Sequence, residues 1–224
     1  MDWIKNFDLF LFDFDGLLVN TEMMHYRAYK EMMEARGVHF NWDFKRYCKS
    51  AHYGATLFRE RITEQYPELL SQVESWDTLY AEKQAAMLKL LEEGKVELMP
   101  GVKALLEKLK AAEKKRAVVT HSPNKFIVSL RSQHPVLDEI ENWITREQYN
   151  EPKPNPECYR LAIQKLKENG DKVIGFEDTP RGLTALMGTE AKPVLVCDVD
   201  YPEIPEFKAK GALHFTHFDK VSIS

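Results

Sequence analysis

Cysteine is scarce in this chain of 224 residues, and what little there is forms no pattern. Cys48, Cys158 and Cys197 are an odd number of thiols, lie far apart and include no C-x-x-C pair, so neither a disulfide framework nor a zinc site is indicated. His214 and His217 are three residues apart, but no third ligand accompanies them, and we interpret them as structural. Reduced thiols are typical of the cytoplasm, where we expect this protein.

Long hydrophobic runs are also missing. No stretch approaches the ~18 consecutive apolar residues that a transmembrane helix requires. The amino terminus, MDWIKNFD, carries acidic residues where a signal peptide needs a basic region followed by an apolar one. The sequence therefore predicts neither export nor a membrane partner.

A surplus of charge of one sign is absent as well. The chain has 31 basic and 35 acidic residues, a net charge of -4, and the two signs are interleaved. The densest basic stretch, residues 103–116, alternates with leucines and glutamates at helical spacing, which is typical of a solvated helix face. We therefore expect no nucleic-acid partner, and our working expectation for the oligomeric state is a monomer.

Short apolar runs alternate with amphipathic segments through the second half of the chain. This order predicts an α/β fold, in which a parallel sheet is covered by helices on both faces and binds ligands at the carboxyl ends of its strands. The predicted strands are 8–12, 117–120, 142–145, 172–176 and 193–197. The predicted helices between them are 101–113, 123–133, 157–169 and 180–187.

Residues 18–96 follow a different pattern, which predicts helices only. Asn20 or Thr21 can cap a helix that ends at Gly37, and further helices are expected at 55–66 and 71–93. A helical block of this size after the first strand predicts a cap domain over 18–96, inserted into a core domain made of 1–17 and 97–224. Its two hinges are expected near residues 17–20 and 94–99.

Two aspartates interrupt the first apolar run, LFDFDGLLVNTE. Asp13 and Asp15 are two residues apart at a strand end, so both side chains point to the same side of the extended chain. Carboxylates among apolar neighbours are costly unless a cation, a proton or hydrogen bonds compensate them, and a metal is one explanation. An EF-hand is excluded because Gly16 follows Asp15 directly. A purely structural pair that caps the strand remains the alternative.

Further polar residues stand at the other predicted strand ends. Thr120 closes RAVVT, Lys153 lies in the turn EPKPNP, and Glu177 and Asp178 close VIGFED. Taken singly, each has an ordinary interpretation as a turn residue, a solvated lysine or a helix cap. Together, at the edge of one sheet, they supply the hydroxyl, the ammonium and the third carboxylate that phosphoryl transfer requires.

The order DFDG-LLVNTE, then AVVT, then KPNP, then GFEDTPRG resembles the four motifs of the haloacid dehalogenase (HAD) superfamily. The helical insert resembles the C1-type cap of its beta-phosphoglucomutase-like branch. The resemblance spans nearly the whole chain, and it implies a Rossmann-like core domain with an inserted all-helical cap domain.

The resemblance also implies a catalytic set. Asp13 would be the nucleophile that forms an aspartyl phosphate, and Asp15 the general acid and base. Mg²⁺ would be held by the Asp13 and Asp178 carboxylates and the backbone carbonyl of Asp15. Lys153 would neutralise Asp13 and the phosphoryl oxygens, and Thr120 would donate a hydrogen bond to the phosphoryl group.

Other residues are implied in supporting or substrate-binding roles. Glu177 would orient Lys153 or a metal-bound water. The expected substrate-binding residues are Gly16, His25, His121, Ser122 and Asn124. For His25, packing or surface exposure is the alternative interpretation, and Lys89 is a weaker candidate for a basic cap residue.

The cap departs from the mutases of this branch. Their Gly-x-x-Arg stretch grips a second phosphate, whereas the nearest segment here, SAHYGAT, offers Ser50 and Tyr53. The absence of that arginine favours hydrolysis over the mutase reaction, in which the phosphoryl group is transferred back to the sugar. The leading hypothesis is a Mg²⁺-dependent phosphohydrolase, or phosphatase, that acts on a small phosphorylated metabolite such as a sugar or nucleoside phosphate. A phosphosugar mutase and a non-catalytic binding protein are the alternatives.

Overall fold

The structure is a computed structural model that describes residues 2–94 and 96–223. Met1 and Ser224, at the ends of the predicted core domain, and Lys95, in the predicted second hinge, lie outside the described residues. The chain divides into two compact units: a core unit of residues 1–20 and 97–224, and a cap unit of residues 21–96. The predicted cap, 18–96, starts three residues earlier than this unit and ends at the same residue.

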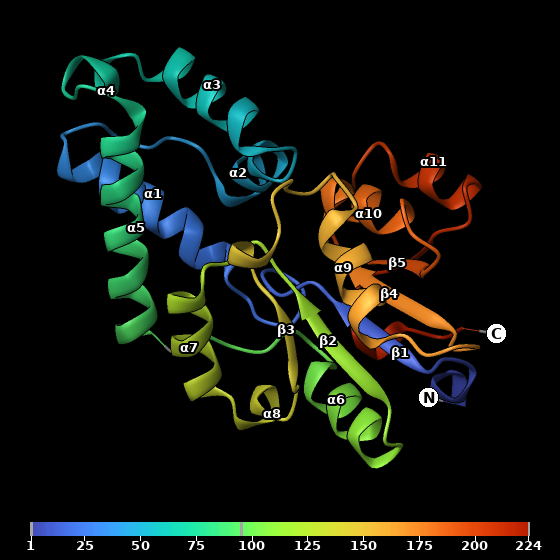
Figure 1. Ribbon diagram of the computed structural model, residues 1–224. Coiled ribbons are helices and arrows are strands. Elements are labelled where there is room, and N and C mark those ends of the chain that lie inside the picture. The colour runs from blue at the N-terminus through green and yellow to red at the C-terminus, as the bar shows by residue number, and fades with distance from the viewer. Residues whose placement is uncertain (1, 95, 224) are drawn as a thin grey trace. The chain divides into compact units, whose positions relative to one another are not determined.

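The core unit is built on a six-stranded parallel sheet in the order β3-β2-β1-β4-β5-β6 (Figure 1). The predicted α/β fold with a parallel sheet is therefore confirmed. The strands are β1 (Leu9–Phe12), β2 (Lys115–Val119), β3 (Asn142–Ile144), β4 (Val173–Glu177), β5 (Lys192–Val196) and β6 (Leu213–Phe215).

The sheet's centre is fully buried. All four residues of β1 are 0% exposed, which explains why this strand is continuously apolar instead of alternating. Phe12 in β1 stacks on Phe176 in β4, with ring centroids 5.1 Å apart. The strand therefore fixes the position of Asp13, whose backbone N–H continues the ladder by donating to the carbonyl of Phe176 at 3.0 Å.

Helices connect and cover these strands. Helix α9 packs on β1, β2 and β3, and α10 packs on β4 and β5. The helices of the core unit are α6 (Val102–Ala111), α7 (Asn124–Gln133), α8 (Pro135–Asp138), α9 (Glu157–Leu166), α10 (Pro180–Met187) and α11 (Ile204–Ala209). Short 3-10 helices lie at Asp2–Asn6, Arg146–Gln148 and Phe218–Lys220.

The cap unit consists of helices, and an aromatic cluster forms its interior. Helices α1 and α5 make the main helix-to-helix contact of the unit. Its helices are α1 (Glu22–Ala35), α2 (Phe44–Ala51), α3 (Ala55–Gln65), α4 (Glu68–Ser71) and α5 (Trp76–Glu93). The interior includes Tyr29, Met33, Phe40, Trp42, Tyr47, Phe58 and Leu79.

Several predicted elements differ from the structure. The predicted helix 71–93 begins only at Trp76, after the separate short helix α4. Thr21 precedes α1, but its side chain makes no capping hydrogen bond. Helix α2 and strand β6 are absent from the sequence-based prediction. Asp43 starts α2 by accepting a hydrogen bond from the backbone N–H of Arg46 at 2.7 Å, a standard N-cap.

Within the described residues, no helix has both the length and the apolar composition that a bilayer span requires. The longest, α5, is 18 residues long and carries charged residues along it.

Candidate active site

Asp13 lies directly after β1, where it is 9% exposed. Its carboxylate accepts a short hydrogen bond from Nζ of Lys153. Burial raises the pKa of the Asp13 carboxyl to about 7, although the positive charge of Lys153 acts in the opposite direction. The residue after β1 is thus a buried carboxyl group next to Lys153, and the lysine offsets only part of the effect of burial on its pKa.

Lys153 is the cation at the centre of this site and is 5% exposed. Besides Asp13, its Nζ donates to the carbonyl of Val119 at 2.9 Å and to Oε1 of Glu177 at 2.7 Å. Burial alone lowers the pKa of the Lys153 ammonium, but the negative charges of Asp13 and Glu177 raise it above its ordinary value. Lys153 is therefore a permanent cation, held between two strand-end carboxylates.

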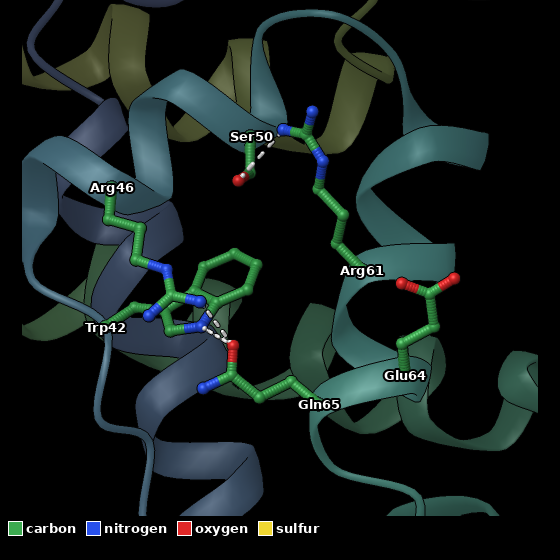
Figure 2. Close-up of a pocket in the computed structure, with 6 residues that line it drawn as sticks. All are labelled: Trp42, Arg46, Ser50, Arg61, Glu64 and Gln65. Atoms are coloured by element: carbon green, nitrogen blue, oxygen red, sulfur yellow. Dashed lines mark hydrogen bonds between the residues drawn. The ribbon is translucent and has the colours of Figure 1, made fainter.

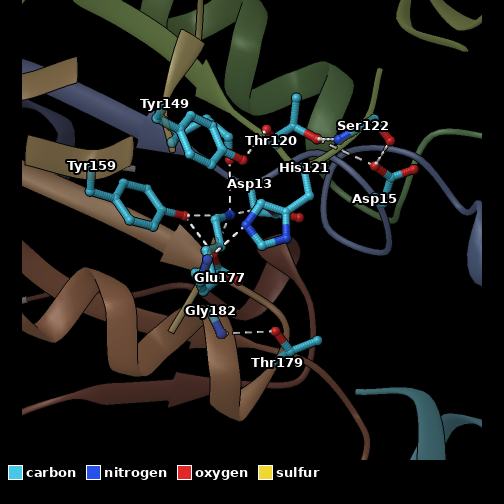
Figure 3. A network of polar contacts seen from close by, with 12 residues as sticks. Asp13, Asp15, Thr120, His121, Ser122, Tyr149, Tyr159, Glu177, Thr179 and Gly182 are labelled. Carbon is cyan, nitrogen blue, oxygen red and sulfur yellow. Dashed lines mark hydrogen bonds and ion pairs between the residues drawn. The ribbon is translucent and has the colours of Figure 1, made fainter. Parts of the chain in front are cut away.

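Glu177 ends β4 and is 1% exposed, and its position depends on two neighbours. The hydroxyl of Tyr159, on α9, donates to Oε1 of Glu177 at 2.5 Å (Figure 3). On the other side, Gly182 in α10 leaves room for the carboxylate, because a Cβ atom there would lie 1.9 Å from Oε2 of Glu177. The backbone N–H of Gly182 donates a hydrogen bond to Oγ1 of Thr179, the N-cap residue of α10, at 3.1 Å.

Asp13, Glu177 and Asp178 together form a buried acidic group. Each offers a carboxylate oxygen, and these oxygens lie within 4.8 Å of one another. Three buried carboxyl groups thus lie close together, and Lys153 forms ion pairs with two of them, Asp13 and Glu177. Hard oxygen ligands in a buried acidic group suit a small divalent cation such as Mg²⁺.

Asp15 faces the loop that follows β2. Its Oδ2 accepts a hydrogen bond from Oγ of Ser122 at 2.5 Å and a longer one from Oγ1 of Thr120 at 3.4 Å (Figure 3). The backbone N–H of Ser122 donates to Oγ1 of Thr120 at 2.9 Å, which locks the two hydroxyls beside each other. Asp15 is only half-buried, so its carboxylate is held in place while it remains accessible to water.

His121 points toward the lysine loop. Its Nε2 accepts a hydrogen bond from the backbone N–H of Lys153 at 2.8 Å. Burial, followed by the charges of Lys153, Arg181 and Arg146, lowers the pKa of His121 to about 2. The imidazole is therefore neutral at physiological pH, and its Nε2 lone pair fixes the lysine backbone.

Gly16 and Asn124 lie at the margin of this network. Gly16 has φ +78°, a left-handed conformation that favours glycine, and its N–H donates to the carbonyl of Val19 at 2.9 Å in the turn after Asp15. Asn124 is exposed at the start of α7, where its backbone N–H donates to Oε1 of Glu147 at 3.1 Å. Among the predicted core residues, Asn124 alone is exposed at its position.

His25 belongs to the cap unit, where it contacts a buried lysine. Nζ of Lys83 lies 2.6 Å from Nδ1 of His25, and Lys83 is 3% exposed. Lys89, the basic residue suggested by the sequence, is instead exposed and lies 3.9 Å from Glu93. Lys83, six positions before Lys89 on the same helix α5, is buried, and the suggested role of Lys89 stays a prediction.

The same part of the cap holds a buried ion pair. His52 lies 3.1 Å from Glu22, and Cys48 is the third member of this potential ligand group. Burial alone raises the pKa of the Glu22 carboxyl, but the charges of His52, His25 and Lys83 lower it to about 2. The Glu22 carboxyl is therefore ionised at physiological pH, and it lies beside His52 inside the cap.

Tyr159, Gly182 and Lys83 are site or cap residues that the sequence-based prediction missed. Lys83 could have been found, since it occupies the buried stripe of α5 at Leu79, Lys83, Met87, Leu90 and Leu91. An ionisable residue in an apolar stripe requires a partner, and this is the signal that was overlooked. Tyr159 and Gly182 gave no comparable signal, because their importance depends on distances to Glu177.

The chain is similar to known proteins over most of its length. Residues 7–187 match the family described as haloacid dehalogenase-like hydrolase. The chain is 29% identical to a phosphorylated carbohydrates phosphatase of Thermotoga maritima, with 78% of each chain covered, and 28% identical to protein CbbY of Cereibacter sphaeroides, with 80% of this chain and 79% of the relative covered.

A solved structure is also similar. The beta-phosphoglucomutase of Clostridium difficile superposes with a TM-score of 0.72 over 97% of this chain and 94% of that chain, at 21% identity. At this level of identity the similarity establishes a shared fold.

Proposed function

Because the chain belongs to the haloacid dehalogenase-like hydrolase family, we propose that it removes phosphate from a small phosphorylated carbohydrate through a covalent intermediate on Asp13. The protein is a phosphohydrolase by its family and by its phosphatase relatives. The nucleophile, the metal and the substrate class are the parts proposed here.

The observation that carries the proposal is the arrangement of charges around Asp13. The carboxylate follows β1, is buried, and contacts the ammonium of Lys153. A nucleophilic carboxylate and a phosphate dianion repel each other, and a fixed cation between them reduces that repulsion without reorganisation during the reaction. If Asp13 and Asp15 only capped the strand, the ammonium of Lys153 would not require Glu177 as a second buried carboxylate partner.

In the first step, a carboxylate oxygen of Asp13 attacks phosphorus, and the bond from phosphorus to the sugar oxygen breaks. The sugar oxygen takes its proton from the Asp15 carboxyl and leaves as an alcohol. Covalent catalysis of this kind divides one difficult displacement into two easier ones. The phosphoryl group is then carried by Asp13 as an aspartyl phosphate.

In the second step, the Asp15 carboxylate takes a proton from water, whose oxygen attacks phosphorus. The bond from phosphorus to Asp13 breaks, which releases inorganic phosphate and restores the carboxylate. The hydrogen bond from Ser122 at 2.5 Å orients Asp15 for both proton transfers. Its half-buried position gives water access to the intermediate.

Mg²⁺ fits the buried acidic group, and Asp13, Asp178 and the backbone carbonyl of Asp15 would hold it. When bound, the ion supplies positive charge that polarises the phosphoryl oxygens and offsets the negative charge of the acidic group. Glu177 is already bound by Lys153 and Tyr159 through Oε1, so its role is to position the lysine.

The remaining loop residues would bind the phosphoryl group. The Thr120 and Ser122 hydroxyls and the turn at Gly16 lie next to Asp15, where an oxygen of the phosphoryl group would be placed. His121, neutral and fixed by Lys153, presents its Nδ1 edge as a further hydrogen-bonding group. For His25, we propose a substrate contact from the cap.

A phosphorylated carbohydrate is favoured because the Thermotoga relative is named for such substrates. The mutase alternative has weaker support, since Tyr53 stands where the mutases of this branch carry an arginine. We further propose a monomer in the cytoplasm, where the three cysteines would stay reduced; all three are buried and free.

The proposal is tested by screening phosphorylated metabolites for release of inorganic phosphate in the presence of Mg²⁺. We expect sugar monophosphates to yield one phosphate for each substrate consumed, with no need for a bisphosphate primer. Asp13→Asn is the matched control, because it is nearly isosteric and leaves a poor nucleophile. Conversion between positional isomers without free phosphate would instead establish a mutase.

A further inference from the structure

A polar cavity lies at the surface of the cap unit, between α2 and α3 (Figure 2). It has a volume of about 470 Å³, within the range of small-molecule sites. Its lining residues are Trp42, Arg46, Ser50, Arg61, Glu64 and Gln65. None of them belongs to the polar network around Asp13, so the cavity requires an explanation of its own.

Arg61 reaches the cavity from α3 and is held by neutral groups. Its Nη1 donates to Oγ of Ser50 at 3.2 Å and to the carbonyl of Lys49 at 3.4 Å. Within the described part of the chain, Arg61 forms no ion pair with a carboxylate, and Nε and Nη2 have no protein acceptor. A guanidinium is always charged and presents its donors as a planar fork, so these nitrogens can bind an anion.

Arg46 borders the same cavity from α2. Its guanidinium lies over the ring of Trp42, 4.8 Å from the centroid, and Nη2 donates to Oε1 of Gln65 at 2.5 Å. Oε1 of Gln65 also accepts from the indole nitrogen of Trp42 at 2.7 Å. Across residues 2–94 and 96–223, no carboxylate forms an ion pair with Arg46. Neutral contacts thus fix the orientation of this second cation, which is exposed to solvent.

The lining therefore favours a ligand with negative charge. Two arginines and the acidic Glu64 give the cavity a net charge of +1, and Ser50 adds a hydroxyl that is 5% exposed. Arginine forks match the oxygens of phosphate better than an ammonium would, since each fork can form two parallel hydrogen bonds. The cavity's size admits a sugar-sized group beside the phosphate.

We propose that this cavity binds the phosphoryl group of a small phosphorylated metabolite through Arg46, Arg61 and Ser50. The site goes beyond the proposed hydrolysis, because none of its residues takes part in that reaction. The ligand is a phosphorylated effector that is separate from the substrate. Its phosphoryl group presents the oxygens that the two arginine forks would bind.

The test follows the indole N–H signal of Trp42 by NMR in the full-length protein, because this group lies in the cavity wall. Trp42→Phe assigns the signal among the four tryptophans. The protein is kept in chelator, and inorganic phosphate and a sugar monophosphate are titrated in turn. Since no turnover is required, failure here is distinguishable from failure of the proposed function.

We expect the Trp42 signal to shift and to saturate as phosphate is added. In Arg61→Met the affinity for phosphate should be roughly tenfold or more weaker, as expected for the loss of a charged hydrogen bond. Arg61→Lys keeps the positive charge but lacks the planar guanidinium, so its affinity for phosphate should lie between those of wild type and Arg61→Met. Glu64→Gln removes the opposing charge and should tighten binding. Arg59→Met is the matched control, since Arg59 is an exposed residue on the same helix, outside this cavity, and should change nothing.

A kinetic measurement then tests the effect of the ligand on turnover. An added phosphate ester should alter wild-type turnover of a sugar monophosphate, and this response should be lost in Arg61→Met. A Trp42 signal that does not move with phosphate, or that moves equally in wild type and Arg61→Met, would overturn the proposal.

Discussion

A Cβ atom on Gly182 would lie 1.9 Å from Oε2 of Glu177, closer than any nonbonded contact allows. The glycine on α10 therefore makes room for the carboxylate that holds the ammonium of Lys153 at 2.7 Å. The backbone of one helix thus determines the position of a cation in the candidate active site. This dependence could not be inferred from either residue alone.

Gly182→Ala should therefore impair catalysis. The added methyl group would push Glu177 out of place and disturb Lys153, and we expect roughly a tenfold or larger loss of kcat, typical of a misplaced electrostatic group. Phosphate release under saturating substrate measures it. Gly188→Ala, just after the end of the same helix, is the control. A Cβ atom on Gly188 would lie 2.9 Å from Cβ of Pro156 and does not contact Glu177. Equal effects of the two substitutions would argue against the Glu177 account.

Removal of the metal should abolish turnover. The buried acidic group places three carboxyl groups beside one ammonium, so phosphate binding beside Asp13 should require a divalent cation. We expect activity to disappear in excess chelator and to return with added Mg²⁺. Full turnover in excess chelator would contradict the metal assignment.

Asp15→Asn should separate proton transfer from metal binding. The backbone carbonyl of residue 15 is unchanged, so affinity for Mg²⁺ should be retained, measured by calorimetry. Turnover of a sugar phosphate should fall by roughly 10²-fold or more, because the leaving oxygen no longer receives a proton. If the variant keeps wild-type activity, another residue must act as the acid and base.

Acid should destabilise the protein through Glu22. Its folded pKa of about 2 lies below the ordinary value of 4.5, so its stabilising effect is present above pH 4.5 and is lost as the pH falls from there toward 2. The shift corresponds to about 3 kcal/mol by linkage. Denaturant unfolding between pH 7 and pH 2 measures the loss.

In Glu22→Gln this part of the pH dependence should be missing, so the stability gap to wild type should narrow as the pH falls. Glu82→Gln is the matched control in the same unit, because the ion pair between Glu82 and Arg36 is more exposed. An unchanged gap between wild type and Glu22→Gln from pH 7 to pH 2 would show that the pair with His52 does not act in this way.

The sequence predicted those features that depend on local periodicity. Asp13 and Asp15 could be placed at one edge because a strand repeats every two residues, and β1 to β5 are apolar runs between helices. Strand β6 was missed because it has three residues, all half-buried, and gives too short a signal. Helix α2 was missed even though its apolar residues have helical spacing, because its charged residues hide the pattern.

Contacts between distant elements could not be predicted in the same way. The hydrogen bond from Tyr159 to Glu177 joins α9 to the end of β4, and only the packed structure gives its length of 2.5 Å. The two arginines of the cap cavity stand 15 residues apart on different helices, and their meeting depends on how α2 packs on α3. Tertiary packing, and not composition, determines such sites.

The most direct test of the account is to trap the phosphoryl group on Asp13. An aryl phosphate, whose leaving group needs no proton, is mixed with the Asp15→Asn variant, and the reaction is quenched in acid for peptide mass spectrometry. The account predicts one burst of phenolate per enzyme and a phosphoryl group on the peptide that contains Asp13, with neither in the Asp13→Asn, Asp15→Asn double variant. A burst with no phosphoryl group on that peptide, or with the group on another residue, would contradict it.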